Sequence, residues 1–88
     1  MTMPPAEPPE RLRWQCRRGL LELDFLLETY LDHAWPILSR PDKALFEELL
    51  RNHDPDLQSW LLGDQDAPRS YRSMLEHILE VSHQVNHQ

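Results

Sequence analysis

Histidine and cysteine are the side chains in this 88-residue sequence that could hold a metal ion or act as nucleophiles. Among the five histidines, His83 and His87 lie four residues apart, so on one continuous helix they would share a face. A structural metal site usually needs about four ligands, however, and this terminal segment offers no third ligand at a firm spacing. The sequence therefore favours solvated histidines over a metal centre.

The other routes to catalysis are also weakly supported. Cys16 lies among arginines that would lower the pKa of an exposed thiol, but its place on a short amphipathic helix favours a small buried side chain. No two carboxylates form a spaced acid/base pair in an evident cleft. The chain has only Gly19 and Gly63, so it can hold neither G-x-G-x-x-G nor a P-loop. We therefore predict no catalytic centre and no nucleotide or flavin site in this chain.

The junction around Gly19 is the remaining candidate for a functional surface. Arg17 and Arg18 are adjacent, and guanidinium groups offer a fork geometry that suits carboxylates. Gly19 lacks a side chain, so a partner's backbone could approach closely, and Glu22 lies beside this basic end. The alternative is a glycine break between helices, flanked by solvated charges and a weak Arg18–Glu22 pair. The residues alone give these two interpretations equal weight.

The elements that must position this junction are predicted to be helices. Leucine occurs sixteen times, whereas only six residues are β-branched. Helices favour Leu, Glu, Gln and Arg, while strands draw on β-branched residues. We therefore predict an all-α fold, a compact bundle of about five short helices in a single domain.

Prolines, glycines and the spacing of apolar residues delimit these helices. The expected helices span 10–18 and 20–34, then one that opens with Ser39 as its cap, one from Asp54 to Gly63, and one from residue 68 or 69 towards His83. Trp14 is expected to face inward with the stem of Arg18, Asp54 to cap its helix, and Gly63 to end that helix in the left-handed conformation. The predicted organisation is a flexible proline-rich tail over 1–9, one helical domain over 10–84 and a frayed end over 85–88.

Charge is distributed unevenly along the chain. The formal net charge is −6, which disfavours nucleic-acid binding because proteins that track phosphates are usually basic. Four arginines nevertheless precede Gly19, a pattern that suits one local anionic group. No run approaches the ~18 apolar residues of a membrane span, and the start lacks the character of a signal peptide. With its single cysteine, the sequence predicts a cytoplasmic protein that does not insert into membranes.

Two sequence motifs resemble those of a known family. The segment from Arg18 to Glu22 matches R-G-x-x-E, and the segment from Asp54 to Leu61 matches D-P-D-L-x-x-W-L at a similar distance downstream. The first motif alone is a weak signal, but the two together, with the chain length and helical character, are specific over about residues 11–62. The sequence thus resembles the succinate dehydrogenase assembly factor family, also called the SdhE or flavinator family.

This resemblance implies an assembly factor that is not itself an enzyme. Members bind the flavoprotein subunit of succinate dehydrogenase, and in some bacteria that of fumarate reductase, and promote covalent attachment of FAD to a flavoprotein histidine. The cofactor then belongs to the partner, so the protein needs none of its own. Carried over by motif, the partner-binding residues are Arg17, Arg18, Gly19, Glu22 and Asp56. Leu57 and Trp60 fit a core role better. The rival class is a small helical regulator, such as an antitoxin that binds a toxin protein or nucleic acid.

Overall fold

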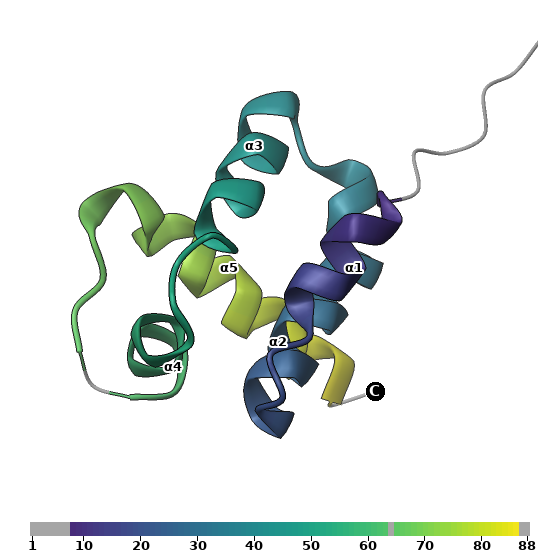
Figure 1. The fold of residues 1–88 in the computed structure, drawn as a ribbon. Coiled ribbons are helices and arrows are strands. Elements are labelled where there is room, and N and C mark those ends of the chain that lie inside the picture. Colours follow the sequence, from purple (N-terminus) through teal and green to yellow (C-terminus); the bar gives the residue numbers. More distant parts are fainter. Residues whose placement is uncertain (1–7, 64, 87–88) are drawn as a thin grey trace, which may run out of the picture.

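The computed structural model describes residues 8–63 and 65–86, which form five α-helices and no strand (Figure 1). The helices are α1 (Glu10–Cys16), α2 (Leu21–His33), α3 (Arg40–Leu49), α4 (Asp54–Leu62) and α5 (Arg69–Asn86), with a 3₁₀ turn, η1 (Trp35–Ile37), after α2. The predicted all-α bundle is confirmed. No helix in the described ranges is both long enough and apolar enough to cross a bilayer.

The core forms where α2 packs against α5, and the shorter helices cover this pair. In Figure 1, α1 lies along α2 and α3 packs against α5, while α4 contacts both central helices. Tyr30, Phe46 and Ile78 are fully buried, so α2, α3 and α5 each place a large side chain at the centre. Leu57 of α4 is also fully buried, which confirms its predicted core role. Burial of this apolar surface is the main force that holds the small domain together.

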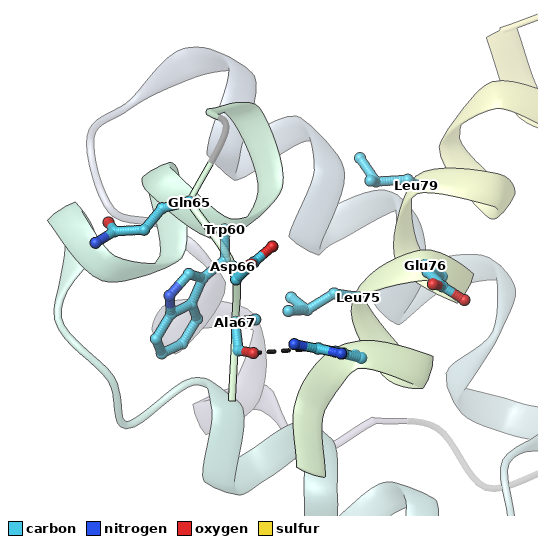
Figure 2. A pocket seen from close by; sticks show the side chains of 8 residues that line it. Trp60, Gln65, Asp66, Ala67, Leu75, Glu76 and Leu79 are labelled. Carbon is cyan, nitrogen blue, oxygen red and sulfur yellow. Dashed lines mark hydrogen bonds between the residues drawn. The ribbon is translucent and has the colours of Figure 1, made fainter. Parts of the chain in front are cut away.

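Trp60 is only partly buried, although it packs against the core as expected. Its ring centroid lies 5.7 Å from that of Tyr71. The exposed part of Trp60 lines an open pocket of about 330 Å³ between the α4–α5 connection and α5 (Figure 2). One wall of this pocket is held by Arg72, whose Nε donates to the carbonyl of Ala67 at 3.4 Å.

Helix α1 presents a single apolar face to the core. Leu12 and Cys16 are both completely buried, as their spacing of four residues predicts. The prediction for Trp14 is wrong: its side chain is 64% exposed. A helix of seven residues has one face in contact with α2, and Leu12 and Cys16 occupy it. Trp14 instead lies outside, where the guanidinium of Arg17 stands 5.3 Å from its ring centroid.

The structure confirms one of the predicted capping residues of α3 and α4 and corrects the others. Ser39 Oγ accepts a hydrogen bond from the N–H of Asp42 at 3.3 Å, which confirms the predicted cap. Asp54 is not a cap, because His53 occupies that position and Asp54 is the first residue of α4. Gly63 is not left-handed, since its φ is −111°. A Cβ at Gly63 would lie 3.0 Å from the carbonyl oxygen of Ser59, a tight contact that a larger residue could make only if this backbone shifted slightly.

Helix α5 continues to Asn86, beyond His83, towards which the helix was predicted to run. Val85 packs against the core in this last turn, so a tertiary contact extends the helix. Residues 1–7 of the predicted tail and residues 87–88 of the predicted frayed end lie outside the described residues.

Candidate functional site

The loop between α1 and α2 carries Arg18 and Gly19 of the first motif, and the chain turns at Gly19. Its φ of +78° is the only positive value in the described part of the chain, and glycine adopts this conformation without steric cost. A Cβ added at Gly19 would meet no atom within 4 Å, so the loop faces open space. The backbone conformation, not crowding, therefore requires glycine in the free protein.

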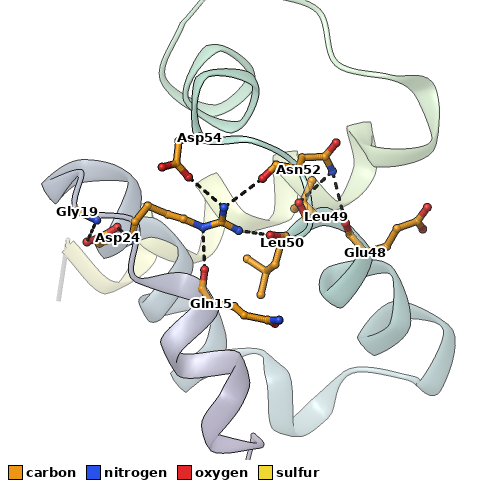
Figure 3. Close-up of polar contacts among 9 residues, drawn as sticks. Gln15, Gly19, Asp24, Glu48, Leu49, Leu50, Asn52 and Asp54 are labelled. Carbon is orange, nitrogen blue, oxygen red and sulfur yellow. Dashed lines mark hydrogen bonds and ion pairs between the residues drawn. The ribbon is translucent and has the colours of Figure 1, made fainter.

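Asp24 fixes this loop from the first turns of α2. Its Oδ1 accepts the N–H of Arg18 at 2.7 Å, and its Oδ2 accepts the N–H of Gly19 at 3.2 Å (Figure 3). The helix has no side-chain cap at Leu20, and Asp24 instead binds the backbone N–H groups of the two residues that precede that position. The sequence alone gave Asp24 no role. An acid a few residues after a glycine break is the signal that could have revealed it.

Arg18 crosses from this loop to the connection between α3 and α4. Its Nε donates to the carbonyl of Gln15 at 2.8 Å, and its Nη2 donates to the carbonyl of Leu50. Its Nη1 donates to the carbonyl of Asn52 at 3.1 Å and to Oδ1 of Asp54 at 3.0 Å (Figure 3). Only 14% of the Arg18 side chain is exposed. The guanidinium is therefore an internal clamp in the free protein.

The two motifs meet at this clamp, because Arg18 belongs to the first and Asp54 begins the second. The weak Arg18–Glu22 pair considered from the sequence does not form, since Arg18 uses its donors on other partners. Glu22 is exposed in the first turn of α2, and Asp56 is exposed in the first turn of α4. The clamp thus brings the starts of α2 and α4 beside Gly19.

The other arginines of the basic segment pair with acids elsewhere in the chain. Their partners and N–O distances are Arg11–Glu47 at 2.7 Å, Arg13–Asp32 at 2.6 Å and Arg17–Glu28 at 2.9 Å. These pairs are partly exposed, so each contributes about 0–1 kcal/mol to stability. The sequence suggested that this arginine cluster suits an external anion. In the structure, these three arginines form ion pairs within the chain, and the pairs orient α1 on α2 and α3. Arg17 remains 56% exposed and accessible from outside.

The buried Cys16 is poorly suited to nucleophilic catalysis. Burial, assisted by the charge of Glu28, raises the pKa of its thiol from 9.0 to about 12, although Arg18 and Arg13 act in the opposite direction. The thiol is therefore protonated near neutral pH, and the thiolate is the reactive form. Within residues 8–63 and 65–86, no three histidine, cysteine, aspartate or glutamate side chains gather into a group that could hold a metal ion.

Comparison with known proteins decides the family. Residues 10–82 match the family model described as flavinator of succinate dehydrogenase. The chain belongs to this family. The flavinator match covers α1 to α4 and most of α5, so it extends well beyond the two motifs. It includes the C-terminal helix, for which the sequence offered no motif, and it favours the assembly factor over the antitoxin-like regulator.

Curated relatives of this chain are named FAD assembly factor SdhE. The protein from Idiomarina loihiensis is 44% identical over 73 residues, which cover 77% of this chain and 81% of the relative. The protein from Coxiella burnetii is 38% identical over 74 residues, which cover 83% of this chain and 90% of the relative. The protein from Shewanella oneidensis is 47% identical over 58 residues, or 66% and 71% of the two chains. No solved structure matches the chain.

Proposed function

We propose that this protein is an FAD assembly factor that binds the flavoprotein subunit of succinate dehydrogenase and promotes covalent attachment of FAD to it. The observation that carries this proposal is the flavinator family match over residues 10–82. The relatives named FAD assembly factor SdhE support it. The flavoprotein subunit of fumarate reductase is a second partner of the same kind, and the cytoplasm is the compartment in which we place the assembly step.

In this proposal the chemistry takes place in the partner. The bond-forming histidine and the FAD belong to the flavoprotein, and the assembly factor holds it in a conformation that can react. The chain therefore needs no FAD site and no catalytic group of its own. The buried, protonated thiol of Cys16 is consistent with such a role.

The contact surface is the loop at Gly19 together with the exposed residues beside it. We assign direct contact to Arg17, Gly19, Glu22 and Asp56, all of which are exposed. Arg18 serves the same surface indirectly, because its guanidinium is already bonded to Asp54 and to backbone carbonyls. The open space above Gly19 is where the partner backbone approaches.

The direct test mixes the purified protein with apo-flavoprotein and FAD and follows covalent flavin by fluorescence in a denaturing gel. We expect the protein to accelerate covalent labelling under conditions in which spontaneous attachment of FAD is slow. Labelling that proceeds at the same rate with and without the protein would contradict the proposed function.

A pair of variants at Gly19 separates the open surface from the backbone conformation. Gly19→Ala and Gly19→Arg both impose the strain of a positive φ, about 1–2 kcal/mol, but only arginine fills the space outside the loop. We expect both variants to keep their helical circular dichroism, Gly19→Ala to retain most of the stimulation and Gly19→Arg to lose it. If Gly19→Ala loses stimulation to the same extent, the close approach of a partner at Gly19 is wrong.

A further inference from the structure

An apolar groove lies beside Gly19, between the start of α2 and the ends of α4 and α5. We define the groove by Leu21, Phe25 and Leu62, with Glu22 at its rim. These three apolar side chains are 88%, 41% and 40% exposed, respectively. Large apolar side chains on a monomer surface need no explanation when scattered, but a contiguous group next to a polar rim marks an interaction surface.

The groove consists of two adjoining hollows that share Leu21, Glu22 and Leu62. The first, of about 380 Å³, extends along Phe25 and Leu26 towards Ser82 on α5. The second, of about 340 Å³, extends along Leu20 and Leu23 towards Gln58 on α4. Both are open and mostly apolar, and they lack the several convergent polar groups that orient a small ligand. Their shape and chemistry suit protein side chains.

Glu22 indicates the charge of the occupant. Its carboxylate stands at the rim of both hollows, and no hydrogen bond or ion pair engages it within the described part of the chain. A basic side chain beside an apolar one would satisfy Glu22 while the apolar side chain fills the groove. The chain's net charge of −6 attracts such a segment as well.

We propose that this groove receives a segment of the flavoprotein subunit in which an apolar side chain stands next to a lysine or arginine. The inference rests on the proposed function and adds the chemistry of the partner segment. The groove is continuous with the loop at Gly19, because Leu21 and Glu22 follow that glycine directly. A second copy of this chain fits less well, since both copies would carry the same net charge of −6 and repel each other.

The test measures binding of the full chain to the purified apo-flavoprotein by biolayer interferometry. Leu21→Ser is the main variant, because a side chain that is 88% exposed contributes little to folding. Ile37→Ser is its matched control, since Ile37 is 81% exposed on η1, outside the groove. We expect Leu21→Ser combined with Leu62→Ser to weaken binding at least tenfold, Leu21→Ser alone about threefold or more, and Ile37→Ser less than twofold.

A second pair of variants tests the charge. Glu22→Gln should weaken binding and flatten its dependence on salt concentration, whereas Glu48→Gln, at an exposed position of α3, should change neither. Wild-type affinity for Leu21→Ser would overturn the groove proposal while leaving the proposed function intact. Equal effects of the two glutamate variants would overturn the groove proposal as well, together with the contact assigned to Glu22. Self-association of the wild type that Leu21→Ser abolishes, measured by analytical ultracentrifugation, would assign the groove to a second copy instead. Failure of the wild type itself to bind the flavoprotein would overturn the proposed function.

Discussion

Replacement of Arg18 by alanine should destabilise the free protein, although the sequence places Arg18 in a partner-binding motif. In the structure, Arg18 donates to the carbonyls of Gln15, Leu50 and Asn52 and to the carboxylate of Asp54. Its neighbour Arg17 is the natural control, because it has the same side chain with 56% exposure and a single ion pair, to Glu28. The two adjacent arginines therefore separate an internal clamp from a surface charge.

The magnitude follows from the bonds that are lost. A hydrogen bond that involves a charged group contributes about 1.5–3 kcal/mol, but the members of one cluster are not additive. Asp54 is 40% exposed and regains water when Arg18 is removed, so its share is small. The carbonyls of Leu50 and Asn52 lose a largely buried donor. We expect Arg18→Ala to lower the free energy of unfolding by about 2–4 kcal/mol, and Arg17→Ala by less than about 1 kcal/mol.

Urea denaturation monitored by circular dichroism provides the measurement. Alongside the two single variants, Asp54→Ala and the double variant Arg18→Ala/Asp54→Ala complete a thermodynamic cycle. We expect a coupling free energy of about 0.5–1 kcal/mol between Arg18 and Asp54, because the ion pair is only partly shielded from solvent. Arg18→Lys should recover part of the loss, since an ammonium keeps the charge but lacks the planar fork that reaches several acceptors.

One result would refute this reasoning. If Arg18→Ala unfolds within about 0.5 kcal/mol of the wild type, like a typical surface substitution, the clamp does not stabilise the free protein. Arg18 would then be available to the flavoprotein, and its place in the motif would reflect direct contact.

Two further predictions concern Asp24 and the buried titrating groups. Asp24→Ala removes the acceptors of two backbone N–H groups, so the amides of Arg18 and Gly19 should exchange hydrogen at least tenfold faster in NMR; unchanged rates would show that Asp24 does not hold the loop. Burial raises the pKa of Cys16 from 9.0 to about 12 and that of Tyr30 from 10.0 to about 12, the latter with help from Asp42. Both groups are protonated in the folded protein, so their contribution to stability is complete below pH 9 and is lost as the pH rises towards 12. The urea midpoint should therefore fall across that range, and native Cys16 should resist iodoacetamide at pH 8; a constant midpoint together with rapid labelling would contradict the burial argument.

The helices could be predicted from the sequence because their signals are local. The apolar spacing of α2, the cap at Ser39 and the proline after α2 each act within a few residues, and the structure follows them. Where one residue type serves two purposes, local reasoning failed. Gly63 indicated a left-handed helix end, but its backbone is extended, and a Cβ there would lie close to the carbonyl oxygen of Ser59.

The position of the candidate site could be predicted from the sequence, but the contacts within the site could not. Arg18, Gly19 and Glu22 stand out by motif, and the structure places the first two in the α1–α2 loop and Glu22 in the first turn of α2. That Arg18 reaches a carbonyl at Asn52, 34 residues away, depends on how the α3–α4 connection packs, which no spacing rule encodes. The role of Asp24 was missed because its partners are backbone amides of the loop, so only its spacing from Gly19 could have indicated that role.

The contact between Arg18 and Asp54 also means that the first motif should not keep its conformation in an isolated peptide. A peptide that carries only R-G-L-L-E would lack the carbonyls of residues 50 and 52 and the carboxylate of residue 54, so nothing would hold its loop in shape. Such a peptide should compete poorly for the flavoprotein. A minimal mimic of this protein must therefore join the α1–α2 loop and the α3–α4 connection in one scaffold. An inhibitor designed on the first segment alone would have the same sequence but would not adopt the same conformation.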